Sequence, residues 1–157
     1  MTTARDTAGV IAPPPLIYLG FLLVGWGLTQ VFVDPGLGLE PEARRLSAFI
    51  LIIAGLVLEG VAAGQFRRLD TRPEPWKPTT ALATGGLYRL SRNPIYVGFT
   101  LMYLGFAVAM DSLITLAAIL PCLVVIDRFV ILREEAYLAR KFGGSYAAYC
   151  TKVRRWL

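Results

Sequence analysis

Four long runs of apolar residues constrain this chain more than any other feature. They cover about residues 16–33, 46–65, 95–110 and 113–132, and they lack the regular polar positions of a helix that is half-exposed to water. A helix needs roughly 20 mostly apolar residues to cross the hydrocarbon core of a bilayer. The runs predict an all-α integral membrane protein with four transmembrane helices, of which the last two form a C-terminal helical hairpin across the short link at 111–112.

The basic residues predict the orientation of these helices. Most of the 16 Lys and Arg residues lie in the long segment 66–94 or in the tail 133–157. Loops rich in Lys and Arg stay on the cytoplasmic side of a membrane, so both termini and the long loop are predicted to be cytoplasmic. The net charge of +5 could also indicate nucleic-acid binding. Because the charges border the apolar runs, we interpret them as topological and predict no nucleic-acid partner.

The basic tail keeps a helical spacing of large side chains. Aromatic and apolar residues recur every three to five positions between residues 134 and 157, with charged residues between them. This pattern predicts that the fourth helix leaves the membrane, breaks at Gly143-Gly144 and continues as an amphipathic helix along the cytoplasmic surface. The simplest interpretation of the aromatic side chains is an interfacial belt at the membrane surface.

The chain contains no histidine and only two cysteines, Cys122 and Cys150. A histidine-free chain has no His-ligated zinc or haem and no catalytic triad that uses imidazole, and we predict no metal. Cys122 lies within an apolar run and Cys150 in the basic tail, so no structural disulfide is expected. Residues 1–12 are polar and give no sign of a cleavable signal peptide.

Four ionisable residues lie at the cytoplasmic end of the fourth run: Asp127, Arg128, Glu134 and Glu135. Charges at membrane depth are costly, so each needs a reason. In a regular α-helix a spacing of seven places Asp127 and Glu134 on one face, and Arg128 and Glu135 on a neighbouring one. Asp127 and Arg128 could simply pair and reach the headgroups. The two adjacent glutamates oppose the helix dipole, which favours a cationic or polyhydroxy ligand beside them.

A second polar segment, residues 84–96, precedes the third run. Gly86 allows close approach of the backbone, and Arg92 offers a planar fork to a carboxylate. Asn93 is biased away from helix by Pro94, which is suited to open the third helix. Read alone, the segment could be no more than a polar loop and a helix start.

These two segments together carry a resemblance. The chain reads Gly86-x-Tyr88-x3-Arg92-Asn93-Pro94-x-Tyr96-x-Gly98, then a helical hairpin, then Glu134-Glu135-x-Tyr137-Leu138-x3-Phe142-Gly143-x2-Tyr146-x2-Tyr149-x3-Val153-Arg154-Arg155-Trp156. This ordered set resembles the isoprenylcysteine carboxyl methyltransferase family, which is related to the phospholipid N-methyltransferases. The resemblance implies a single domain over 1–157, with two transmembrane helices and a loop in 1–78 and a cofactor-binding core in 79–157. The first two runs resemble the family only in being apolar.

The resemblance implies a bacterial-type, multi-pass enzyme of the inner membrane that uses S-adenosyl-L-methionine and a lipophilic acceptor from the bilayer. Arg92, Asn93 and Glu134 are the implied catalytic residues, with Arg92 suited to the cofactor's carboxylate and a glutamate to its ammonium or ribose diol. The isoprenylcysteine enzymes usually carry histidine where Asn93 stands, and asparagine cannot titrate. The cofactor contacts that the resemblance implies are Gly86, Tyr88, Arg92, Asn93, Pro94, Tyr96, Glu134 and Glu135.

Methyl transfer from a sulfonium needs alignment and a water-poor site more than acid–base chemistry, so a histidine-free chain can perform it. Glu59, near the end of the second run, could face the same pocket, or could pair locally and reach the headgroups. Two other functions fit less well. A membrane reductase of the sterol-reductase type is usually much longer, and a four-helix transporter or scaffold predicts polar residues near the midplane. The acceptor stays open among a prenylated carboxylate, a phospholipid amine, a phenol and a thiol.

Overall fold

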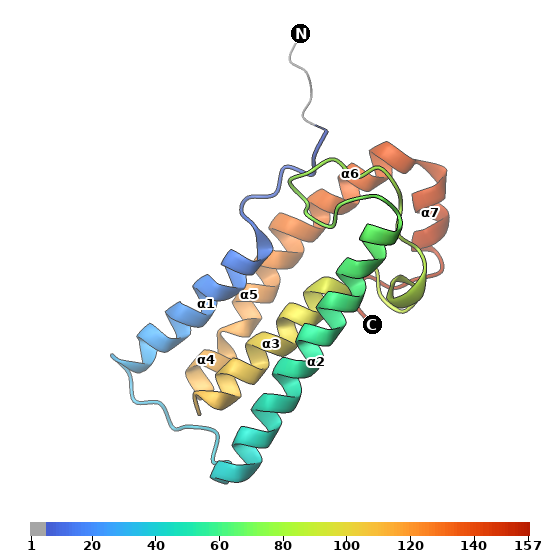
Figure 1. Ribbon diagram of the computed structural model, residues 1–157. Coiled ribbons are helices and arrows are strands. Elements are labelled where there is room, and N and C mark those ends of the chain that lie inside the picture. Colours follow the sequence, from blue (N-terminus) through green and yellow to red (C-terminus); the bar gives the residue numbers. More distant parts are fainter. Residues whose placement is uncertain (1–5) are drawn as a thin grey trace.

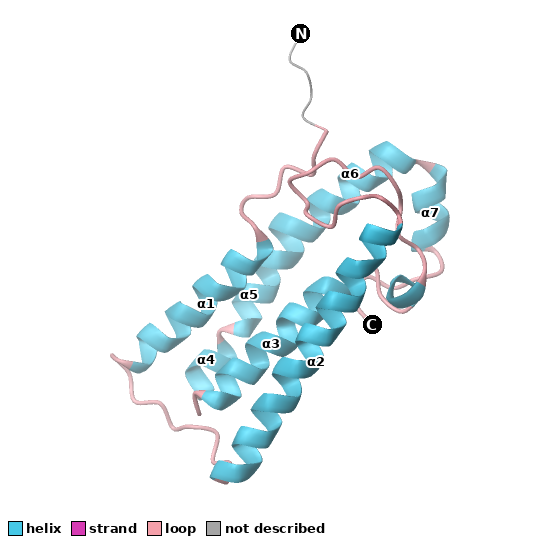
Figure 2. Ribbon diagram, viewed as in Figure 1, coloured by secondary structure: helices cyan, strands magenta, loops and turns pink. Residues whose placement is uncertain are grey.

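The computed structural model of the chain describes residues 6–157, and every regular element in that range is helical (Figure 1, Figure 2). Each of the four apolar runs is confirmed as a helix. The first three are α1 (Pro14–Thr29), α2 (Pro41–Arg68) and α3 (Pro94–Ala109). The fourth is a rod of consecutive turns: α4 (Leu113–Ala117), α5 (Ile119–Ile126), the π-helical turn η2 (Asp127–Ile131) and α6 (Leu132–Phe142). A 3-10 helix, η1 (Gly86–Arg89), precedes α3, and α7 (Gly144–Cys150) follows α6.

Proline positions explain where these helices begin and where the rod is interrupted. A proline lies in the first turn of α1, α2 and α3, where a missing N–H loses no hydrogen bond. Within the rod, α4 ends at Ala117 and α5 begins at Ile119. Pro121 has no N–H to donate to the Ala117 carbonyl, and its ring crowds that group, so the break falls four residues before it.

Two of the helices are long and apolar enough to cross a membrane. They are α2 and the rod Leu113–Phe142, and the most apolar windows of these two helices are only 17% and 33% buried in the protein. The apolar helices α1 and α3 are shorter, at 16 residues each. Large apolar side chains on α1 and α2 also point outward, among them Leu23 and Val57. Exposed apolar surface of this extent is typical of an interaction with lipid or protein.

Glycines bring α2 and α3 close together along their length (Figure 1). A Cβ atom placed on Gly55 would lie 2.6 Å from the Gly98 carbonyl oxygen, and one on Gly98 would lie 2.9 Å from the Gly55 carbonyl oxygen. A Cβ atom on Gly105 would lie 3.0 Å from two backbone atoms of α2, the Ala48 carbonyl oxygen and the Ile52 nitrogen. Small residues at such crossings allow backbones to touch.

The two short loops at one end of the bundle are bonded to each other. Asp34 accepts hydrogen bonds from the Ser112 hydroxyl and, at 3.0 Å, from the Leu113 N–H, while Arg44 pairs with Asp111. The bond from Ser112 holds the pKa of Asp34 below its ordinary value. The N-terminal segment, the loop 69–85, α6 and α7 gather at the opposite end (Figure 1). The two basic segments therefore lie at the same end, as the sequence predicts.

The tail breaks where the sequence predicts but packs differently. Gly143 ends α6 with a φ of +51°, a conformation that glycine adopts at little cost. Tyr146, Tyr149 and Val153 are then buried against Tyr88 and Ala62 in a second small core. The interpretation of the tail aromatics as an interfacial belt is wrong for these residues, because the tail folds back over the ends of α2 and η1 and its rings face inward.

Candidate active site

A cavity of ≈240 Å³ lies at the end of the bundle where the N-terminal segment and the tail meet. Its walls come from α2, the loop 69–85, the start of α3, α6 and α7, and they are mostly apolar. The volume falls just below the roughly 300–1,000 Å³ of small-molecule sites. Of the eight residues predicted to bind a cofactor, six line this cavity: Tyr88, Arg92, Asn93, Tyr96, Glu134 and Glu135.

Gly86 and Pro94 lie outside the cavity lining. Gly86 opens η1 with a φ of +52°, and a Cβ atom there would collide with the Gln65 side chain of α2. In its satisfied orientation the Gln65 amide donates to Gly85 O at 2.9 Å and accepts from the Leu87 N–H at 3.0 Å. Pro94 is buried as the first residue of α3. Both residues shape the backbone that carries the site.

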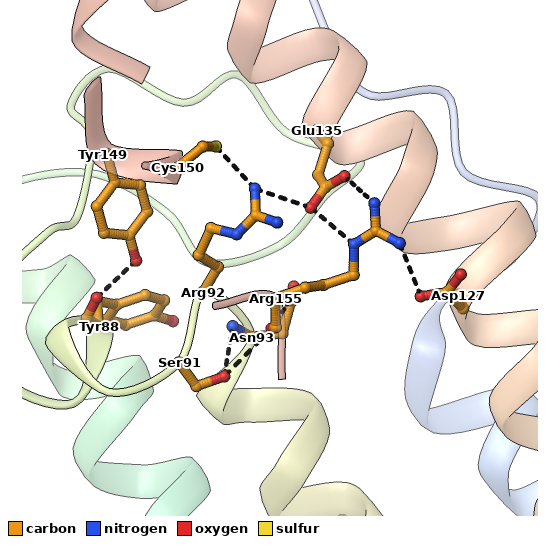
Figure 3. Close-up of polar contacts among 9 residues, drawn as sticks. All are labelled: Tyr88, Ser91, Arg92, Asn93, Asp127, Glu135, Tyr149, Cys150 and Arg155. Carbon is orange, nitrogen blue, oxygen red and sulfur yellow. Dashed lines mark hydrogen bonds and ion pairs between the residues drawn. The ribbon is translucent and has the colours of Figure 1, made fainter. Parts of the chain in front are cut away.

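Arg92 lies between the tail and α6 (Figure 3). Its Nη1 is 3.2 Å from Glu135 Oε1 and also donates to the sulfur of Cys150. The side chain is only 16% exposed. Its Nε is fully buried and makes no hydrogen bond within residues 6–157. The Nη2 of Arg92 also makes no hydrogen bond within the described residues, and unlike Nε it is not enclosed by protein atoms, so it is the group of this guanidinium that is suited to an anionic ligand.

Glu134 lines the same cavity from α6. Its Oε1 accepts a hydrogen bond of 2.7 Å from the Tyr96 hydroxyl, and no basic side chain of the described chain pairs with it. The Glu134 carboxylate therefore keeps acceptor capacity for a further donor. The α3–rod hairpin brings the Arg92 guanidinium and the Glu134 carboxylate to the same cavity.

Asn93 bonds the tail to the start of α3 and also lines the cavity. It precedes α3, is 8% exposed, and its side-chain amide donates to the Arg155 carbonyl at 2.9 Å. The Ser91 hydroxyl donates to the same carbonyl at 3.3 Å. At the neighbouring turn, the Tyr149 hydroxyl donates to the Tyr88 carbonyl at 2.6 Å, and burial raises the pKa of Tyr149 to about 12. These bonds attach the tail to the start of α3.

The π-helical turn η2 changes which acidic residues share a helix face. The spacing of seven predicts that Asp127 and Glu134 lie together, but Asp127 and Glu135 instead bond the same guanidinium, that of Arg155 (Figure 3). That prediction is wrong because a π turn takes more residues than an α turn, so the shared face is reached one residue later. Arg128 extends outward, 69% exposed, with its Nε 3.9 Å from Asp127, in line with the predicted local pair.

A two-part cover lies over the cavity. Residue Ala8 of the N-terminal segment and residues of the loop 69–85 line it, and the Ala8 N–H donates to Pro75 O at 3.2 Å. The Tyr137 hydroxyl joins both parts to α6, since it donates to Asp6 Oδ1 at 3.0 Å and accepts from the Thr79 N–H at 3.1 Å.

Several lining residues come from segments to which sequence patterns assign no role. Glu59 of α2 does reach the cavity, as one of its two interpretations requires. Phe66, Arg72 and Trp76 also line it, and no motif marked them. Arg155, one residue of the tail motif, pairs with Glu135 at 2.7 Å, and this bond raises the pKa of Arg155 further. Its place beside the site follows only from the folding of the tail.

A protein-family model described as phospholipid methyltransferase matches residues 43–145, from the start of α2 into α7. The chain belongs to the phospholipid methyltransferase family. The predicted relationship is thereby confirmed, and the match extends upstream of residue 79 to include Glu59 and the loop 69–85.

The chain also resembles an uncharacterized protein of Haemophilus influenzae. The two are 36% identical over 63 residues, which make up 40% of this chain and 100% of that protein.

Proposed function

We propose that this family member is an integral membrane methyltransferase that transfers a methyl group from S-adenosyl-L-methionine to a lipophilic acceptor. The observation that carries the proposal is the cavity lined by both Arg92 and Glu134, which offers a guanidinium and a carboxylate in a chain of a methyltransferase family. Neither the membrane reductase nor the transporter gains support from the family match.

The cavity groups suit the two ends of S-adenosyl-L-methionine. Arg92 lines the cavity, and its Nη2, which bonds no group of the described residues, would bind the cofactor's carboxylate. Glu134, held by Tyr96, would bind the ammonium or the ribose diol. Asn93 lines the same wall. When bound, the cofactor supplies an electrophilic methyl group on a sulfonium. The protein's part is to align the cofactor and acceptor and to exclude water, which the apolar lining favours.

The acceptor in this proposal is an isoprenylcysteine-type carboxylate or a lipid. Glu59 gives a reason to favour a lipid that carries a hydrogen-bond donor, such as an amine. Its side chain lines the cavity from α2, and a second carboxylate would meet repulsion there. An amine would instead find an acceptor. Substituting Glu59→Gln should therefore weaken methylation of amine lipids more than it weakens cofactor binding, and equal losses would remove the argument for an amine.

The membrane arrangement in the proposal is a single domain with four spans, in the inner membrane, with both termini in the cytoplasm. Thiol labelling tests it in a background where both native cysteines are replaced. Val33→Cys lies in the α1–α2 loop, where Val33 is 95% exposed, and Lys152→Cys lies in the tail, where Lys152 is also exposed. In intact cells a membrane-impermeant reagent should label only the loop position. Equal labelling of both would refute four spans.

Calorimetry on the purified protein tests the cofactor. S-adenosyl-L-methionine and its demethylated product should bind, and Arg92→Ala should lose roughly 2–4 kcal/mol of binding, because it leaves the ligand carboxylate unpaired. Arg89→Ala is the matched control, since Arg89 is exposed and makes no ion pair in the described structure. If the wild-type protein binds a nicotinamide cofactor and not S-adenosyl-L-methionine, the proposal fails.

A further inference from the structure

Arg155 bridges two acidic residues that belong to different parts of the rod (Figure 3). Its Nε and Nη2 donate to Glu135 Oε1 and Oε2 at 3.0 and 2.7 Å, a fork-to-fork pair, and its Nη1 lies 3.4 Å from Asp127 Oδ1. The Arg155 side chain is 33% exposed and that of Glu135 is 17% exposed. Bidentate pairs of this kind fix the geometry of both partners.

This pairing makes the two adjacent glutamates unequal. Both oxygens of Glu135 are engaged by Arg155, and one of them also faces Arg92 Nη1 at 3.2 Å. Among residues 6–157, the Glu134 carboxylate is bonded only by the Tyr96 hydroxyl. Glu135 thus has little acceptor capacity left for a ligand, whereas Glu134 retains it.

The same pairing decides what Arg92 can offer. An arginine and a glutamate without other partners tend to form a bidentate pair, in which two guanidinium N–H groups bond the two carboxylate oxygens. Such a pair between Arg92 and Glu135 would occupy the N–H groups of Arg92 that a ligand carboxylate needs. Because Arg155 bonds both carboxylate oxygens of Glu135, Arg92 contacts Glu135 through Nη1 alone. The Arg92 Nη2 is left without a bond to any described residue, and it is the donor that a ligand carboxylate can meet.

The backbone of Arg155 is held independently of its side chain. Its carbonyl accepts from the Asn93 amide and the Ser91 hydroxyl, two buried groups. A substitution of the Arg155 side chain leaves both bonds available. The effect of the side chain on the cavity can therefore be separated from the docking of the tail.

We infer that Arg155 is a positioning residue of the cofactor site. It holds Glu135 so that Glu135 orients Arg92 while leaving a guanidinium N–H of Arg92 free for the ligand. With Glu135 engaged in this way, Glu134 is the glutamate that bonds the ligand. This inference rests on the proposed function, because the ligand in question is S-adenosyl-L-methionine. It adds a residue from the tail to the site and divides the roles of the two glutamates.

The test is a double-mutant cycle on Arg155 and Arg92, with the dissociation constant of S-adenosyl-L-homocysteine as the readout. Arg155→Gln should weaken binding roughly 3- to 30-fold, the range expected when contacting charged groups are coupled. Arg155→Lys keeps the charge but loses the fork, so it should restore only part of the affinity. In an Arg92→Ala background the further effect of Arg155→Gln should fall to within about twofold, because Arg155 acts through Arg92.

Arg140→Gln is the matched control, since Arg140 lies on the same helix as Glu135, is exposed and forms no ion pair within residues 6–157. It should bind as the wild type does. If Arg155→Gln weakens binding equally with and without Arg92, its role is structural and the inference is wrong. Normal binding by Arg155→Gln would also overturn it. If the wild-type protein itself does not bind, the proposed function fails first, so the two failures are distinguishable.

Discussion

The backbone contact between α2 and α3 allows a stability prediction with a defined sign. A Cβ atom on Gly55 would lie 2.6 Å from both the Gly98 carbonyl oxygen and Met102 Cγ, whereas ordinary contacts begin near 3.4 Å. A carbonyl oxygen within a helix cannot move aside alone, so Gly55→Ala must displace one helix from the other. Overpacking of this kind costs about 1–3 kcal/mol. The better helix propensity of alanine offsets up to about 1 kcal/mol.

The control lies on the same helix. No atom lies within 4 Å of a Cβ placed on Gly60, so only the propensity term applies there, and Gly60→Ala should gain up to about 1 kcal/mol. Thermal melting in detergent micelles, followed by circular dichroism, should lower the melting temperature for Gly55→Ala and raise it for Gly60→Ala. If both variants melt alike, α2 and α3 do not touch through their backbones, and the reasoning is refuted.

Three further predictions concern the site and the loops. Glu134→Gln should weaken cofactor binding on its own, whereas the effect of Glu135→Gln should largely vanish in an Arg92→Ala background, and calorimetry of these variants would show whether the two roles differ. Tyr137→Phe removes the hydroxyl that joins the two-part cover to α6, so stopped-flow binding and release should both become faster; unchanged rates would mean that the cover is not on the cofactor's route. The pKa of Asp34 is lower in the folded than in the unfolded state, so its stabilisation is complete above the ordinary aspartate pKa and is lost as the pH falls through the folded value. Melting temperatures measured across acidic pH should show this slope in the wild type and not in Asp34→Asn.

Much of the architecture follows from the sequence because its causes are local. Apolar runs define the helices, and prolines fix where they begin. The polar segments at residues 84–96 and 134–135 could be brought together in advance, because a short link folds the third and fourth runs into a hairpin. The placement of Arg92, Tyr96 and Glu134 on one cavity agrees with that expectation.

The features that sequence reasoning missed depend on tertiary contacts or on irregular backbone. Spacing arguments assume an α-helix throughout, so they paired Asp127 with the wrong glutamate across η2. The tail tyrosines have the same spacing whether they face lipid or protein, and only docking onto α2 and η1 decides the question. Trp76 belongs to a loop without periodicity, so no pattern indicated that it covers the cavity.

The π-helical turn also determines where in the rod a single residue can be lost without disturbing the site. An α-helix advances about 100° per residue, so an insertion or deletion elsewhere in the rod before Glu134 would swing Glu134 and Glu135 away from the cavity. At η2 the helix already contains one residue more than an α-helical turn would hold. Deleting Phe129, whose side chain is 45% exposed, would turn the π turn into an ordinary one and leave α6 facing as before. This stretch is where the rod can lose one residue while the site keeps its geometry.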